Sequence, residues 1–496
     1  MTTTTTTAKK DSFDRFGDDL AELLLQYLPI KDRLILQSVS KQWLALIFTT
    51  QTDLIFGKKL NNMSLNSIDL NYYETIIKWF EVIVSKCPNI TAVNINVSIK
   101  FPGSVHIMNQ IMNLLIKYCH QLLHISIELH YRGLWSDFDS MFESLFTKFG
   151  RQLLTFKFDG NNLRFNKQLF YDVVNGVTNL KTLDIIYRGR LFGSGRKSSV
   201  QLNDIFRDNN KFYSLPKSLQ SLNIKLDDTS LPLFANFADI YGHQLISLTL
   251  LIDESVVDED KEWAVNLKPL STGFRQMPRL RQLMFDLPIN FSLEFIGDLF
   301  TTIGRNCRQL KSLHYECRSY YSNISIINPM FDAIDEHMSR QLRRLSVDCS
   351  AVYDNDLLLT SGSLNRLHAL THLILRSNVS SIIGDQFFRD IHRNLPRLQY
   401  IKCDRMSITD ESIAAMGQLA HLRDVYLPTY GYIEKTSEAN IRRHLLIDTK
   451  VKHLFLVYKD SIDGIQQVFK CGKYVDNDNQ ISSNSFIGSL IASDSD

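Results

Sequence analysis

One apolar pattern recurs along most of the chain: the hexapeptide L-x-x-L-x-L, with other apolar residues allowed at its three anchors. Successive copies start 24 to 39 residues apart. A single match means little, because only three apolar positions are required, but regular recurrence indicates a repeated structural unit. Thirteen copies are readable, and they begin at Ile90, Leu122, Leu153, Leu180, Leu219, Leu245, Leu280, Leu310, Leu342, Leu370, Leu398, Leu422 and Val451.

Each copy reads as a short strand. Its last two anchors, two residues apart, point to the same buried face, and the residue between them points outward. Ahead of many copies, apolar residues recur at helical spacing, as at Phe295, Leu299 and Ile303 or at Phe387, Ile391 and Leu395. One strand and one helix cannot bury their own apolar faces, so the units must stack. The sequence therefore predicts an α/β fold, a leucine-rich-repeat solenoid with a concave parallel sheet and convex helices.

The charge balance names no partner. The chain has 55 Lys and Arg residues against 53 Asp and Glu residues. Without a basic block it does not resemble a dedicated nucleic-acid binder. It also lacks a run of about 18 apolar residues that could cross a bilayer, and residues 1–7 lack the apolar core of a signal peptide. We therefore expect no nucleic-acid or membrane partner and a cytoplasmic or nuclear location.

The seven cysteines are odd in number and scattered. This distribution favours reduced thiols over a disulfide framework, and it lacks the paired spacing of a zinc site. We predict no metal site. Cys87, Cys119 and Cys307, each just before a predicted strand, are expected to be small buried hydrophobes rather than reactive groups.

Residues 14–57 read as a compact unit of three helices. Leu20, Leu23, Leu24 and Leu28 form an apolar stripe on the first helix, which Pro29 ends. Asp32 is placed to cap the second helix, and Trp43 lies on the third. A block of this size cannot bury so much apolar surface by itself. Its leftover helix faces predict either a partner or docking onto the solenoid.

This block resembles an F-box. Members of that family read approximately Leu-Pro, an acidic pair of positions, Leu-Leu, Tyr-Leu-Pro, a Lys-Asp-Leu helix start and Ser-Lys-x-Trp. The matching positions include Asp19, Leu20, Leu23, Leu24, Tyr27, Leu28, Pro29, Asp32, Leu34, Val39, Ser40, Lys41 and Trp43. The family's opening Leu-Pro is replaced by Phe16-Gly17.

The resemblance implies that the block binds a Skp adaptor and, through it, a cullin scaffold. The residues expected to bind the adaptor are Leu20, Leu23, Leu24, Leu28, Pro29, Asp32, Val39 and Trp43. The alternative is a helical cap that only shields the first repeat.

The remaining boundaries follow from composition and repeats. Residues 1–13 form a Thr-rich tail and residues 475–496 a polar tail, and both are predicted to be disordered. Residues 58–88 are expected to supply a linking helix and solenoid cap, and residues 89–474 the solenoid. Two loops stand out, a basic one at 188–201 and an acidic one at 253–262. Both read as binding loops or as tolerated surface insertions.

No motif for catalysis or for phosphate, cofactor or metal binding is present in the sequence. We therefore predict neither catalytic residues nor a cofactor. Outward strand positions on the concave face form the expected surface for an unknown protein substrate. Candidates there are Arg344, Asp348, Arg376, Lys402 and Asp404. A solvated face, with no ligand, is the other interpretation of these charges.

Together these features predict a non-catalytic substrate-recognition subunit of a Skp–cullin–F-box ubiquitin ligase, in which the F-box binds the adaptor and the repeats bind a protein destined for ubiquitin-dependent degradation. The alternative is a repeat scaffold that binds proteins without any role in ubiquitin transfer.

Overall fold

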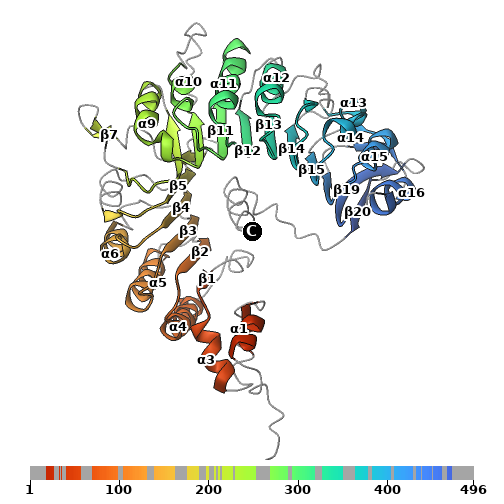
Figure 1. Ribbon diagram of the computed structural model, residues 1–496. Coiled ribbons are helices and arrows are strands. Elements are labelled where there is room, and N and C mark those ends of the chain that lie inside the picture. The colour runs from red at the N-terminus through yellow and green to blue at the C-terminus, as the bar shows by residue number, and fades with distance from the viewer. Residues whose placement is uncertain are drawn as a thin grey trace, which may run out of the picture. The chain divides into compact units, whose positions relative to one another are not determined.

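The fold is seen in a computed structural model of the full chain (Figure 1). The chain divides into two compact units, residues 1–230 with 244–251 and residues 231–243 with 252–496, and each is described by itself. The residues that the structure describes are 18–26, 33, 35, 41–56, 70–98, 104–130, 139–161, 176–188, 197–199, 206–207, 211–212, 215–226, 230–252, 268–288, 293–318, 327–349, 364–377, 383–403, 407–427, 432–436, 438–448, 451–460 and 466–471.

The first unit begins with two helices that pack against each other and continues as alternating strands and helices. Its strands β1, β2, β3, β4, β5 and β9 pair in parallel in that order, and β9 then pairs with β10. Figure 1 shows α4, α5 and α6 along one face of this sheet. The elements are α1 (Asp18–Gln26), α3 (Lys41–Thr49), β1 (Asp53–Phe56), α4 (Leu70–Lys86), β2 (Ala92–Ser98), α5 (Ser104–Tyr118), β3 (His124–His130), α6 (Asp139–Phe149), β4 (Thr155–Asn161), β5 (Thr182–Arg188), β6 (Lys197–Ser199), β7 (Phe206–Arg207), β8 (Lys211–Phe212), β9 (Ser221–Leu226) and β10 (Ser247–Ile252).

The second unit repeats the arrangement. Strands β11, β12, β13, β14, β15, β17 and β19 pair in parallel in that order, and β20 adds to β19 as an antiparallel strand. The elements are η5 (Leu231–Leu233), α9 (Phe234–Tyr241), η6 (Gly242–Gln244), α10 (Lys268–Phe274), β11 (Gln282–Pro288), α11 (Leu293–Asn306), β12 (Ser312–Arg318), α12 (Ile327–Met338), β13 (Arg344–Cys349), β14 (His372–Ser377), α13 (Asp385–Phe388), α14 (Ile391–Asn394), β15 (Tyr400–Cys403), β16 (Ser407–Ile408), α15 (Asp410–Met416), β17 (Asp424–Leu427), β18 (Tyr432–Thr436), α16 (Glu438–Ile441), the π-helical turn η10 (Arg442–Asp448), β19 (His453–Asp460) and β20 (Gln466–Cys471).

The predicted anchors form the core. In all thirteen copies the first and second anchors are at most 5% exposed. Second anchors of neighbouring copies face each other in register, as in the run from Leu283 to Leu313 and Leu345. A one-residue slip would turn every anchor to the opposite face, so this register confirms the predicted leucine-rich-repeat solenoid.

Backbone hydrogen bonds lock the same register. The carbonyl of Thr91 accepts hydrogen bonds from the N–H groups of Leu123 and His124 at 2.7 and 2.9 Å. In the next repeat the carbonyl of Leu123 accepts hydrogen bonds from the N–H groups of Leu154 and Thr155 in the same way. This shared acceptor recurs between successive strands of the two parallel orders given above, and it spares the buried turn an unsatisfied carbonyl.

The helical layer differs in one place from the sequence prediction. The apolar positions Phe387, Ile391 and Leu395 predict one helix, but the structure has two short helices, α13 and α14, separated at Arg389 and Asp390. The three side chains are still buried, so the break preserves the apolar face. None of the described helices is long and apolar enough to cross a membrane.

The cysteines at the strand entrances behave as predicted. Cys87, Cys119 and Cys307 are fully buried, and burial raises the pKa of their thiols to about 11, 12 and 12 respectively. A thiol with such a high pKa carries almost no thiolate near neutral pH and is therefore a poor nucleophile. These three residues act as small apolar side chains that pack between adjacent repeats.

Helices α11 and α12 approach each other closely at Gly304. A Cβ atom at this position would lie 2.5 Å from the Cβ atom of His337. Gly304→Ala is therefore expected to destabilise this helix pair by about 1 to 3 kcal/mol, because the packed neighbours must move apart. The measurement is hydrogen–deuterium exchange of α11 and α12, since a long repeat array does not unfold in one step.

The matched control is Gly176→Ala. A Cβ atom there would lie 3.9 Å from the Cβ atom of Phe146, which is ordinary contact. Equal exchange rates in wild type and Gly304→Ala would show that the helix pair does not depend on the missing side chain.

Candidate functional site

The first helix of the chain presents an apolar face to solvent. In α1, Leu20, Leu23 and Leu24 are 43%, 48% and 42% exposed, whereas Ala21 and Leu25 are fully buried on the opposite side. Three leucines at this spacing form one continuous surface on a helix. These are the predicted adaptor-binding leucines, and they are accessible in the free chain.

The third helix of the predicted module supplies both interior and surface. Trp43 and Ile47 of α3 are buried, and Leu44 is 40% exposed. The Trp43 ring lies in the interior of the module in the free chain, and its part in adaptor binding stays a prediction. The sequence match identified the position but not the direction of the side chain.

Other predicted positions cannot be placed. Leu28, Pro29, Asp32 and Val39 lie outside the described residues. Between them, Ile35 is 66% exposed.

The module passes into the sheet without a linker. Helix α3 ends at Thr49, and β1 starts at Asp53 and pairs with β2. The sheet therefore begins earlier than the first copy predicted at Ile90. Residues 51–56 are an additional copy in which Gln51, Leu54 and Phe56 take the three anchor positions. The sequence pattern missed this copy because it requires an apolar first anchor.

Gln51 uses its polar side chain to join the module to the sheet. It is buried, its Nε2 donates to the carbonyl of Asp53, and its Oε1 accepts a hydrogen bond from Arg33 Nη1 at 3.1 Å. Arg33 is itself buried, and burial lowers the pKa of its guanidinium. A buried guanidinium needs acceptors, so this pair joins Arg33 to the segment that leads into β1.

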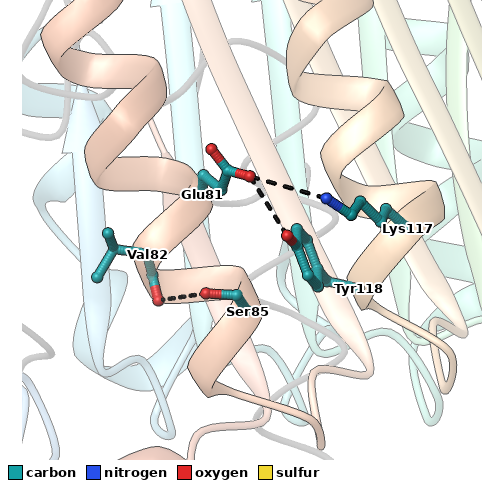
Figure 2. A network of polar contacts seen from close by, with 5 residues as sticks. All are labelled: Glu81, Val82, Ser85, Lys117 and Tyr118. Carbon is teal, nitrogen blue, oxygen red and sulfur yellow. Dashed lines mark hydrogen bonds and ion pairs between the residues drawn. The ribbon is translucent and has the colours of Figure 1, made fainter.

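Polar contacts fix the next two helices. Glu81 of α4 accepts a hydrogen bond from the Tyr118 hydroxyl of α5 at 3.3 Å, and its Oε1 lies 4.0 Å from Lys117 Nζ (Figure 2). At the other side of α4, Lys86 Nζ lies 5.2 Å from the centre of the Phe48 ring of α3. Helix α4 is thus held between α3 and α5.

The predicted substrate residues lie on the face of the second unit's sheet opposite the helices. Asp348 and Arg376 form an ion pair at 3.6 Å. Lys402 was predicted to face solvent but is only 3% exposed, and its Nζ lies 4.3 Å from the centre of the Tyr426 ring. A side chain at an outward-facing strand position is therefore not always exposed to solvent. Arg344 is partly exposed, and Asp404 lies outside the described residues.

Arg344 belongs to a row that the sequence analysis did not assemble. Strand register places Arg344, His372, Tyr400, Asp424 and His453 side by side on five adjacent strands. The His372 and Tyr400 rings stack with centroids 5.6 Å apart, and His453 Nδ1 lies 2.6 Å from Asp424 Oδ1. We call this set the strand-entry row. It combines aromatic, cationic and anionic groups on one face of the sheet.

Three comparisons place the chain among known proteins. Residues 13–50 match the family model described as F-box domain. A search of curated protein sequences finds no match. Among solved structures, the Rad7 and Elc1 complex in yeast is similar with a TM-score of 0.44, 12% identity and coverage of 86% of this chain and 91% of that one.

Two further structures resemble the chain more weakly. The leucine-rich repeat-containing protein LegL7 from Legionella pneumophila has a TM-score of 0.34 at 8% identity, with 69% of this chain and 93% of that chain covered. An internalin from Listeria monocytogenes has a TM-score of 0.32 at 13% identity, with 83% and 90% covered. The assignment as a leucine-rich-repeat solenoid rests on the strand register and buried anchors of this chain.

The Gln51 and Arg33 pair gives a double-mutant prediction. Gln51→Leu and Arg33→Met are each expected to cost about 1 to 3 kcal/mol, because each removes one side of the buried hydrogen bond between these two side chains. The double variant is expected to recover most of that loss, since both partners are then apolar. Native-state hydrogen exchange of α3 and β1 measures these costs. Strictly additive losses would mean that the two side chains are not coupled.

The strand-entry row gives a pH prediction. Burial and the neighbouring Arg344 lower the pKa of His372 from 6.5 to about 4, although Asp424 opposes the shift. The unfolded chain therefore binds the proton more strongly, and stability is expected to fall by up to about 3 kcal/mol as pH drops from about 6.5 to 4. Exchange of β14 and β15 across this range measures the loss. His372→Gln should remove its pH dependence, and an unchanged profile would contradict the assignment.

Proposed function

We propose that this chain, which carries an F-box domain ahead of a leucine-rich-repeat solenoid, is the substrate-recognition subunit of a Skp–cullin–F-box ubiquitin ligase. The observation that carries the proposal is the exposed leucine face of α1 within the matched residues 13–50. F-box domains bind Skp-type adaptors, and an apolar helix face of this kind requires a partner to remove it from water.

The contribution of this chain to ubiquitin transfer is positional. A chain that holds a substrate near a reactive thioester on another subunit raises the effective concentration of the reacting lysine, and it needs no reactive group of its own. With this role, the protein is proposed to act in the cytoplasm or the nucleus.

The substrate is proposed to bind the sheet face of the second unit. Support comes from the strand-entry row, whose side chains span five neighbouring strands. Arg344 is the member of the row that the sequence analysis selected. Asp348 and Arg376 partly satisfy each other and Lys402 is buried, so these three are proposed to shape the surface rather than to supply its main contacts.

Adaptor binding tests the proposal. Leu24→Asp is expected to weaken binding of purified Skp-type adaptor to the full chain by at least about 100-fold, because a charge would be buried in an apolar interface. Isothermal titration calorimetry measures the affinity, and co-purification with cullin from cells checks the assembly.

The matched control is Ile240→Asp. Ile240 lies on α9 and is 44% exposed, close to the 42% of Leu24, so the same change is made on an equally exposed apolar residue outside the F-box. Its adaptor affinity should equal that of wild type. If wild type itself fails to bind the adaptor, the chain is a repeat scaffold outside the ligase, and Phe16-Gly17 in place of Leu-Pro becomes the first position to restore.

A further inference from the structure

The segments that lead into the strands of the second unit concentrate positive charge. Before β11, β12, β13, β14 and β15 these segments span residues 275–281, 305–311, 336–344, 366–371 and 389–399. Together they hold thirteen Arg and Lys residues against two Asp and Glu residues, a net charge of +11 in a chain whose net charge is +2. The sequence shows no basic block because the cations come from separate repeats, a few from each.

Strand register brings three of these cations together. Strands β11, β12 and β13 pair in parallel, and their first residues lie opposite one another. The residues immediately before these strands are Arg281, Lys311 and Arg343, so the three lie side by side at the strand entrance. Neighbouring strands are about 4.8 Å apart, so one cation starts from each strand along this edge. We call Arg281, Lys311 and Arg343 the cationic row.

Backbone hydrogen bonds hold the row in place. The carbonyl of Lys311 accepts from the N–H groups of Arg343 and Arg344 at 2.9 and 3.0 Å, and the carbonyl of Arg281 accepts from Lys311 and Ser312 in the same way. The three backbone positions therefore cannot move apart. Like charges on neighbouring strands repel each other, so the row costs stability in the free chain, and an anionic partner would remove that cost.

The side chains of the row are accessible to such a partner. Arg281 and Arg343 are exposed, and Lys311 is partly exposed. Arg281 Nε donates to the neutral side-chain oxygen of Gln309 at 3.4 Å. Within the described part of the chain, no carboxylate forms an ion pair with any of these three cations.

Local interactions account for other charges on this edge. Arg305 and Arg393 lie in the last turns of α11 and α14, where a cation interacts favourably with the helix dipole. Asp390 pairs with Arg393 at 3.6 Å, and Glu336 lies 3.7 Å from the His337 ring nitrogen. The cationic row follows the turn and lies in no helix, so the helix dipole does not explain it.

The opposite ends of the same strands are negative. Glu316 and Asp348 follow Lys311 and Arg343 by five residues, which is about 16 Å along a strand, and both are partly exposed. A ligand that lies along these strands meets cations at the entrance and carboxylates at the exit. Nucleic acid carries charge of one sign and is repelled at the exit, whereas a polypeptide can carry both signs. The charge pattern therefore favours a protein ligand.

We infer that the cationic row binds an acidic segment of the protein substrate, whose Asp or Glu carboxylates pair with Arg281, Lys311 and Arg343 while the chain continues onto the sheet face. The inference rests on the proposed function, which makes the partner at this face a substrate, and it names the chemical class of that substrate. Arginine pairs with a carboxylate through two parallel hydrogen bonds. The cations stand one to a strand and do not converge on one point, so several carboxylates suit them better than one phosphate.

Fluorescence anisotropy of the full chain with a labelled peptide tests the inference. The probe is a fluorescein-labelled twelve-residue peptide that alternates Glu and Ser. Wild type is expected to bind it saturably, and Arg281→Gln/Lys311→Gln/Arg343→Gln to bind it about tenfold more weakly, the loss expected from three exposed ion pairs. Binding should also weaken as salt is raised. Hydrogen exchange of β11 to β13 that is no faster than in wild type verifies the fold of the free variant.

The matched control removes the same charge from the first unit. Lys148, Lys181 and Lys217 are exposed and lie in the segments before β4, β5 and β9. Lys148→Gln/Lys181→Gln/Lys217→Gln should bind the peptide as wild type does. An equal loss in this variant would show that net charge alone attracts the peptide and would overturn the inference.

Titration of the same proteins with purified Skp-type adaptor separates the two claims. If wild type binds the adaptor but not the peptide, or the row variant matches wild type, only the inference is overturned. If the peptide binds through the row and wild type does not bind the adaptor, the proposed function fails and the acidic-segment site stands. A twelve-nucleotide oligothymidylate that binds the row more tightly than the peptide would assign the edge to nucleic acid and also overturn the inference.

Discussion

The fold depends on a backbone carbonyl in each repeat that accepts hydrogen bonds from the N–H groups of the next repeat. At the strand entrance one carbonyl receives two N–H groups, as Arg281 does from Lys311 and Ser312 at 2.8 and 3.0 Å. This geometry sets the parallel register, and the register in turn places every apolar anchor on the helix side of the sheet. A single repeat has no neighbour whose N–H groups could donate to its carbonyl, and no neighbour that could cover its apolar anchors. Stability is therefore a property of neighbours, and each end of the array needs separate treatment.

The two ends solve that problem differently. At the C-terminal end β20 pairs antiparallel with β19 and satisfies the ladder with one more strand. At the N-terminal end β1 pairs with β2 only, as far as the described residues show, and its entrance is closed by the side chains of Gln51 and Arg33. An open strand edge invites pairing with another chain. The F-box domain adjoins this end of the sheet through Arg33 and Gln51, while its own leucines remain exposed on α1.

The sequence predicts features that depend on periodicity, such as which strand positions are buried. It does not predict the orientation of an individual side chain or which neighbouring side chain covers it. The anchors from Ile90 to Val451 were predictable because burial repeats with the pattern, and their burial confirms them. Gln51 was missed because the template admits only apolar anchors, although its spacing to Leu54 and Phe56 is regular. Trp43 matched the F-box pattern but faces inward. Lys402 alternates outward as predicted yet lies against Tyr426, because strand periodicity says which face a side chain leaves and not what lies over it.

A leucine at position 51 would bury as well as the first anchors of the other copies, so the polar residue calls for a physical reason. Apolar contacts tolerate several orientations of two packed parts, whereas a buried hydrogen bond between Gln51 and Arg33 is satisfied in one. The cost of desolvating a guanidinium is offset only while that geometry holds. Position 51 thus gives up some apolar stabilisation, and in exchange the F-box domain and the first repeats meet at a defined angle.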